Sequence, residues 1–211
     1  MIRGCLTGIY ENDVAGAVGT LTLDGGDVKL QASITDATLA TGPSLNGLSL
    51  SVIKPASFVI DYNLPKKDVK FQFMNSVRVM ERPLHMTYTH WKNENRTALD
   101  GTLMIDQAHK VSANYVLDSG NCKLRYSYNP DGLTTVEPSY DFGSNAWDLS
   151  VTRMVHANDV VSASYQSSSK VLGFDWRRIT SSNGSFKVSA TMNLDEPSKI
   201  PTLTAESTLN F

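Results

Sequence analysis

The stretch KVSANYVLDSGNCKLRYSY, residues 110–128, decides the fold because it describes two strands and the turn between them. Every second residue of each half is apolar, a period of two that separates the two faces of a strand. One face carries Val111, Ala113, Tyr115, Leu117, Cys122, Leu124, Tyr126 and Tyr128, and the other carries Lys110, Ser112, Asn114, Lys123, Arg125 and Ser127. Asp118-Ser-Gly-Asn121 supplies the turn. The stretch therefore predicts a hairpin with one apolar face and one wet, cationic face.

Length and composition limit the classes of protein that this chain can be. Its 211 residues suit a single all-β domain, although two small domains would also fit. The net charge of −2 and the absence of a strongly basic stretch argue against a nucleic-acid partner. No stretch approaches the ~20 apolar residues that a spanning helix needs, and the N-terminus has no continuous apolar region typical of a secretory signal. A helical membrane protein is therefore excluded, but a β-barrel is not.

The alternation of the opening stretch recurs along the whole chain. It predicts sixteen strands separated by turns rich in Gly, Pro, Asn, Asp and Ser. The expected strands are Ile2–Tyr10, Ala15–Leu23, Asp27–Asp36, Gly47–Ile53, Ser57–Tyr62, Asp68–Val79, Pro83–His90, Arg96–Ile105, the two strands within 110–128, Thr134–Phe142, Ala146–Met154, Val160–Gln166, Lys170–Arg177, Ser185–Leu194 and Thr202–Phe211. The short pair around Lys54-Pro-Ala56 and the first two strands carry the weakest signal, so totals of twelve or fourteen strands are kept as alternatives. Trp91 and Arg153 break the alternation, and we expect both at strand ends.

The spacing of these strands matches the thickness of a membrane. A ten-residue strand rising ~3.3 Å per residue and tilted by ~45° spans roughly 23 Å, close to the apolar band of a transmembrane barrel. No composition shift, linker or fixed-length repeat divides the chain. The sequence therefore predicts one all-β domain over residues 1–211, a closed antiparallel up-and-down transmembrane β-barrel of about sixteen strands that contacts membrane lipid and has the capacity to form a homo-oligomer.

A soluble β-sandwich or soluble barrel that binds a ligand or a protein partner is the alternative, since it also alternates apolar and polar residues. Three features favour the membrane barrel. The connections are short and even, no long crossover interrupts them, and the last strand ends on the aromatic Phe211. A closed meander also leaves no strand edge exposed.

The side chains that alternate with the apolar ones are the candidate functional residues. In a transmembrane barrel the face opposite the lipid lines the lumen, and sixteen strands leave a lumen wide enough for water and small solutes. The predicted pore-lining residues are Lys29, Lys70, Asp100, Lys110, Lys123, Arg125, Asp148, Lys187 and Glu206. Because these charges are of both signs, we expect weak selectivity between anions and cations.

The search for catalytic and metal-binding patterns predicts no enzyme, no catalytic residue, no metal site and no cofactor. The histidines His85, His90, His109 and His156 have no partner at ligand spacing. No nucleophile elbow, phosphate-binding loop or dinucleotide fingerprint occurs. The two cysteines, Cys5 and Cys122, are expected as small apolar fillers, with a single long-range disulfide as the alternative.

Five runs of sequence resemble one known family over essentially the whole chain, the chloroplastic outer envelope pore proteins of the 24-kDa class. The runs are Gly26-Asp-Val-Lys-Leu30, Asn63-Leu-Pro-Lys-Lys-Asp68, Phe71-Gln-Phe-Met-Asn75, Leu117-Asp-Ser-Gly-Asn-Cys-Lys-Leu124 and Leu203-Thr-Ala-Glu-Ser-Thr208. The resemblance implies a β-barrel solute channel of the plastid outer envelope that lacks a cleavable transit peptide. It also implies passage of triose phosphates, sugars, nucleotides, dicarboxylates, charged amino acids and ions. The pore-lining residues above come from the alternation of faces and not from the resemblance.

Overall fold

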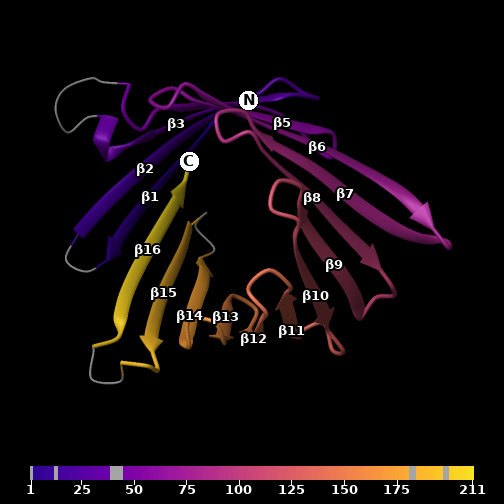
Figure 1. Cartoon of the computed structure of the whole chain (residues 1–211). Helices are drawn as coiled ribbons and strands as arrows, with labels where there is room; N and C mark the ends of the chain where they lie inside the picture. The colour runs from indigo at the N-terminus through magenta and orange to yellow at the C-terminus, as the bar shows by residue number, and fades with distance from the viewer. Residues whose placement is uncertain (1, 12–13, 39–44, 181–183, 197–199) are drawn as a thin grey trace.

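The computed structural model describes residues 2–11, 14–38, 45–180, 184–196 and 200–211. Within these ranges the chain forms sixteen strands that close into one barrel (Figure 1). The strands are β1 Ile2–Glu11, β2 Val14–Asp24, β3 Lys29–Thr35, β4 Ser49–Lys54, β5 Phe58–Asn63, β6 Asp68–Val79, β7 Arg82–Trp91, β8 Arg96–Met104, β9 His109–Val116, β10 Asn121–Tyr128, β11 Thr134–Asp141, β12 Ala146–His156, β13 Asp159–Gln166, β14 Val171–Thr180, β15 Gly184–Asn193 and β16 Thr202–Asn210.

Each strand pairs antiparallel with the next strand in the sequence, and β1 pairs antiparallel with β16. At this seam Leu6 lies opposite Leu209, and Gly4 and Phe211 exchange two backbone hydrogen bonds of 2.7 and 2.9 Å. Because sixteen is an even number of antiparallel strands, β1 starts and β16 finishes at the same end of the barrel (Figure 1). The closed sheet leaves no strand edge along its length, as an up-and-down barrel requires.

The predicted barrel and its sixteen strands are confirmed, and the predicted strand ends differ from the observed ones by only a few residues. The alternatives of twelve or fourteen strands, and of an open sandwich, are therefore wrong. Trp91 is the last residue of β7, as expected. The expectation of a strand end is wrong for Arg153, which lies inside β12, opposite Thr134 at the start of β11. The turn signals at residues 12–13, 39–44, 181–183 and 197–199 lie outside the described residues.

The turns form where an acidic or amide side chain can cap the backbone of the residues that follow it. Asp106 Oδ1 accepts hydrogen bonds of 2.8 Å from the backbone N–H groups of Ala108 and His109. Asp131 Oδ1 accepts two more, of 2.9 Å from Leu133 and 2.6 Å from Thr134. Such turns need only a few residues, so each strand is returned directly beside its predecessor.

The helical content is small. The 3₁₀ helix η1, Asp36–Thr38, follows β3. Among the residues that the structure describes, no helix is long and apolar enough to cross a membrane.

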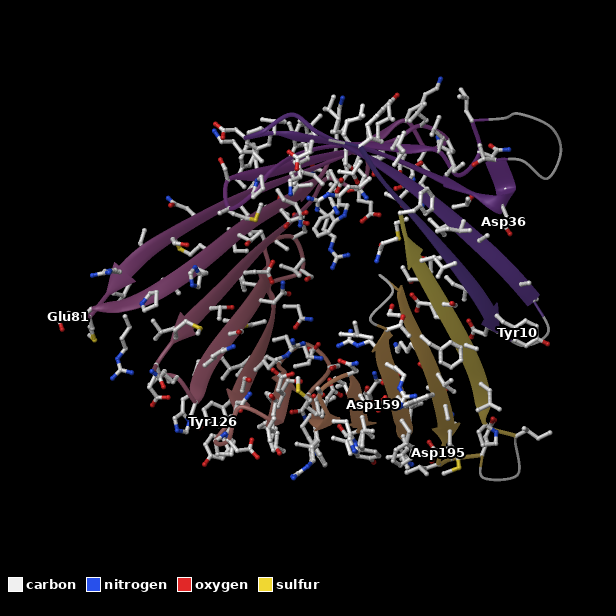
Figure 2. The ribbon with its side chains drawn as sticks, turned by 180° about the vertical axis from the view of Figure 1, so that it is seen from behind. Tyr10, Asp36, Glu81, Tyr126, Asp159 and Asp195 are labelled. Atoms are coloured by element: carbon white, nitrogen blue, oxygen red, sulfur yellow. The ribbon has the colours of Figure 1, made fainter. Side chains whose placement is uncertain are left out.

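The barrel has almost no apolar core. Within the described ranges only Ala98, Val116 and Ala146 are buried apolar residues, and no large side chain is fully buried. The large apolar side chains instead stay exposed, for example Phe174 at 51% and Leu203 at 59%. Figure 2 shows Tyr10 and Tyr126 on the outside of the wall and Glu81 at the tip of the β6–β7 hairpin. An exposed apolar belt over many strands is what a membrane barrel presents to lipid, and a soluble protein rarely exposes such a large apolar surface.

Candidate functional site: the polar inner face of the barrel

The register of the sheet shows which side chains share a face, because residues opposite one another on neighbouring strands point to the same side. Lys123 lies opposite Asn114 on β9, which lies opposite Asp100 on β8. Following these pairs around the closed sheet places all nine predicted residues on one face: Lys29, Lys70, Asp100, Lys110, Lys123, Arg125, Asp148, Lys187 and Glu206. The apolar residues Leu124 and Phe174 lie on the opposite face.

An ion pair that spans two strands identifies this polar face as the concave one. Lys123 Nζ on β10 lies 2.6 Å from Asp148 Oδ2 on β12, although Lys123 lies opposite Asp141 of β11 and Asp148 lies opposite Ser139, so the pair crosses β11 diagonally. Neighbouring strands are ~4.8 Å apart, so side chains two strands apart converge readily only where the sheet curves toward them. These two side chains are 34% and 25% exposed, less than the 55% of both side chains in the Lys170–Asp195 pair, which agrees with an inner position.

Two further ion pairs lie on the inner face. Lys70 Nζ lies 2.8 Å from Asp61 Oδ2, and Lys187 Nζ lies 3.3 Å from Asp175 Oδ1. Asp175 Oδ1 also accepts a hydrogen bond of 2.6 Å from the Ser189 hydroxyl. These pairs hold charges of both signs against the wall at half-exposed positions, so the face is hydrophilic without a single dominant sign.

The predicted set omits several charged residues of the inner face, among them Asp61, Glu137, Asp175 and Arg177. The signal that would have found them is the same period of two. Asp175 alternates with Phe174 and Trp176 in β14, and Asp61 alternates with Ile60 and Tyr62 in β5. Extending the face assignment along every predicted strand would have included all four.

Some charges of the inner face have no ion-pair partner among the described residues. Arg125 and Lys110 are unpaired cations, and Glu137 and Glu206 are unpaired anions. Asp100 accepts a hydrogen bond of 2.6 Å from the Asn114 amide. A depression of about 300 Å³ in the wall is lined by Arg125 and Glu137 together with the Lys123–Asp148 pair. These charges are therefore available to solutes inside the barrel.

Hydroxyl groups cover much of the remaining inner face. Four cross-strand pairs bring their oxygens within 2.9 to 3.1 Å of one another: Thr7–Thr208, Thr20–Ser33, Thr102–Ser112 and Thr152–Ser162. A hydroxyl can both donate and accept hydrogen bonds, so these ladders can bind water without adding charge.

The cysteines occupy opposite faces of the sheet. Cys122 lies on the apolar outer face, opposite Tyr115, as expected of a small apolar filler. Cys5 lies on the inner face, opposite Thr20 and Asn210, so the expectation of an apolar environment is wrong for it. Both thiols are free, and the alternative of a disulfide between them is excluded.

The histidines do not form a common site. His85 lies 2.7 Å from the Ser76 hydroxyl, and His90 lies 2.9 Å from the Thr97 hydroxyl. His109 stacks on Tyr128 on the outer face, with ring centroids 4.9 Å apart. In the part of the chain that the structure describes, no group of three or more His, Cys, Asp or Glu side chains could hold a metal ion.

A closed antiparallel barrel with sixteen strands, an apolar exterior and a polar interior is the architecture of porins. The solved structures agree. The outer membrane protein Omp33 of Acinetobacter baumannii aligns with a TM-score of 0.57 and 15% identity over 100% of this chain and 97% of its own. A mutant porin of Rh. blastica aligns with a TM-score of 0.60 and 8% identity over 100% of both chains. At these identities the likeness establishes the porin fold alone.

The sequence comparisons identify the family. The family model described as outer envelope pore protein 24 matches residues 2–211, and the chain belongs to this family. It is 49% identical to outer envelope pore protein 24B, chloroplastic, of Arabidopsis thaliana over 210 residues, covering 100% of this chain and 98% of that protein. It is 45% identical to outer envelope pore protein 24, chloroplastic, of Oryza sativa subsp. indica over 222 residues, covering 100% and 99%.

Proposed function

We propose that this protein is a water-filled, weakly selective channel of the chloroplast outer envelope, through which small hydrophilic solutes diffuse. The observation that carries the proposal is the charged and hydroxylated concave face, enclosed by sixteen strands and carrying the Lys123–Asp148 pair. Barrels of this strand number leave an aqueous lumen, whereas side chains fill a barrel of about eight strands. The names of the relatives support the location in the outer envelope.

The charge pattern supports passage of solutes of both signs. Three of the inner-face lysines already face a carboxylate, and the unpaired charges include both cations and anions. A pore with balanced signs attracts neither kind of ion strongly. The proposed solutes are those that the family resemblance implies: phosphorylated sugars, nucleotides, dicarboxylates, amino acids and inorganic ions. The nine predicted residues, together with Asp61, Glu137, Asp175 and Arg177, are the proposed lining.

Transport by this wall needs neither a catalytic group nor a cofactor. Each solute exchanges bulk water for the hydrated side chains of the wall and leaves again by diffusion, so no conformational cycle is required. We extend the proposal to membrane lipid as the partner of the apolar outer face, and to self-association within the membrane as compatible with that face.

Reconstitution into a planar lipid bilayer tests the proposal. The detergent-purified protein should give discrete, high-conductance steps, and liposomes that contain it should release phosphorylated sugars and dicarboxylates of low mass. Liposomes prepared in the same way without protein serve as the control. The proposed channel function would be wrong if protein with a strand-dominated circular dichroism spectrum gave no conductance in several lipid compositions.

A further inference from the structure

Trp91 is the one tryptophan of the described chain that lies on the polar inner face. It is the last residue of β7 and lies opposite Lys70 on β6 and Arg96 on β8, both of which share its face. Trp147 and Trp176 instead lie on the outer face, where aromatic residues of barrels contact the membrane interface. A membrane-anchoring role therefore does not account for Trp91, which lies at one mouth of the lumen.

Arg96 lies over the ring of Trp91. Its guanidinium carbon is 5.2 Å from the centroid of the ring, which is the geometry of a cation–π contact. Arg96 makes no ion pair within the described residues. A stacked guanidinium keeps its N–H groups in its own plane, so these donors are available to an anionic group, which they can bind in a bidentate fashion.

The two turns beside Trp91 are fastened to each other and carry more cations. The backbone N–H of Asn93 donates to Asp68 Oδ1 at 2.9 Å, and its side-chain amide donates to the carbonyl of Lys66 at 3.0 Å. This contact joins residues 64–67 to residues 92–95. The joined turns hold three exposed lysines, Lys66, Lys67 and Lys92.

The charge of this mouth is unevenly distributed over the described residues. Around Trp91 four cations, Lys66, Lys67, Lys92 and Arg96, accompany the three carboxylates Asp68, Glu94 and Asp118, of which Asp118 accepts a hydrogen bond of 2.9 Å from the backbone N–H of Thr97. Elsewhere at the same end the described connecting segments carry Asp36, Asp195 and Glu196. The cation Lys170 is there too, but it is paired with Asp195 at 2.6 Å. Anions approaching this end of the barrel are therefore drawn toward Trp91.

We propose that Trp91, Arg96, Lys66, Lys67 and Lys92, here called the Trp91 cluster, bind solutes that combine a planar ring with an anionic group. The ring stacks on the indole of Trp91, and the anionic group is bound by Arg96 and attracted by the three lysines. This inference rests on the proposed function only in that the barrel must be open to solutes at this mouth. Stacking on an aromatic side chain and charge-assisted hydrogen bonding then act on different parts of one ligand.

Equilibrium dialysis of the detergent-solubilised protein against three probes tests this site. AMP carries both the ring and the phosphate, ribose 5-phosphate lacks the ring, and adenosine lacks the phosphate. AMP should bind at least about fivefold more tightly than ribose 5-phosphate, because stacking of a base on an aromatic side chain contributes about 1–3 kcal/mol. Adenosine should also bind more weakly than AMP. Equal affinities for AMP and ribose 5-phosphate in the unaltered protein would overturn the proposal.

Variants assign the two contacts. Trp91→Leu should lower the affinity for AMP to that for ribose 5-phosphate, and Trp91→Phe should restore part of the difference. Arg96→Gln should lower the affinities for AMP and for ribose 5-phosphate by the same factor. Lys170→Gln, at the same end but paired with Asp195, should leave both affinities unchanged. In a Trp147→Phe, Trp176→Phe background, AMP should quench the fluorescence of Trp91. An AMP preference that persists in Trp91→Leu contradicts the proposal.

The dialysis separates failure of this site from failure of the channel, because binding in detergent needs no conductance. A protein that prefers AMP but never conducts would support binding by the Trp91 cluster and contradict the proposed channel function. A protein that conducts but binds AMP no better than ribose 5-phosphate would support the channel function and contradict binding by the Trp91 cluster.

Discussion

The ammonium group of Lys123 on β10 lies 2.6 Å from the carboxylate of Asp148 on β12, across the intervening strand β11. The contact is possible because both side chains lie on the concave face. It also compensates the charge of Lys123 and leaves Arg125, two residues further along the same face, without an ion-pair partner in the described chain. Arg125 is therefore one of the side chains of this wall whose charge should act directly on passing ions.

Replacing Arg125 with Glu changes the charge of the lumen by two units and touches no lipid-facing residue. We expect the reversal potential in a salt gradient to shift toward cation preference. The shift should shrink at high salt, because charges are screened over ~3 Å at 1 M and over ~10 Å at 0.1 M. Single-channel recording at both salt concentrations measures it. Glu137→Gln, a change of opposite sign on the neighbouring strand, is the matched control and should shift the reversal potential the other way. An unchanged reversal potential for a conducting Arg125→Glu channel would remove Arg125 from the conduction path.

Removing the partner of Lys123 should alter conduction more than stability. Asp148→Asn keeps the shape of the side chain but leaves the ammonium of Lys123 uncompensated, so anion preference should rise at low salt. Because both side chains are partly exposed, at 34% and 25%, the pair contributes about 1 kcal/mol or less to the free energy of unfolding. Urea titration and the reversal potential give the two quantities. A large loss of stability with no change of selectivity would contradict this assignment.

An arginine on the outer face should cost much more than one on the inner face. Leu124 and Phe174 lie near the middle of β10 and β14 on the outer face, with 41% and 51% of their surface exposed. Substituting either by Arg should lower the free energy of unfolding in lipid by roughly 2–4 kcal/mol. Ser127→Arg and Thr204→Arg, on the inner face, are the controls and should be tolerated. Equal penalties for the two pairs in a refolding assay would show that the faces are misassigned.

The turn at residues 129–133 should give the barrel a pH-dependent contribution to stability. The backbone N–H of Thr134, followed by that of Leu133, donates to Asp131 and lowers the pKa of its carboxyl group below the usual value of 3.8. A carboxyl group with a lowered folded-state pKa stabilises the fold above about 3.8, and this contribution is lost as the pH falls through the folded-state pKa. The difference in unfolding midpoint between the unaltered protein and Asp131→Ala should therefore be larger at pH 6 than at about pH 2. A difference that does not change with pH would contradict the role of the charged carboxylate.

The sequence by itself determined where most strands lie and how their side chains divide between two faces, whereas the closed sheet was needed to choose sixteen strands over twelve or fourteen. A strand projects alternate residues to opposite sides, so the apolar and polar sets can be read from the order of residues alone. For this reason Lys123, Arg125 and the other predicted residues were found together on one face. The turns are also set locally, because side chains such as Asp131 accept hydrogen bonds from the backbone a few residues further on.

Only the tertiary structure decided which residues of different strands meet. The seam joins Thr7 to Thr208, and the Lys123–Asp148 pair crosses a whole strand, so neither contact has a local signal in the sequence. The inward position of Cys5, and of Trp91 beneath Arg96, likewise depends on the register at which distant segments align. The physical reason is that alternation fixes the face of a residue within its own strand. Closure and curvature of the sheet fix which face encloses the lumen and which charges come close enough to pair.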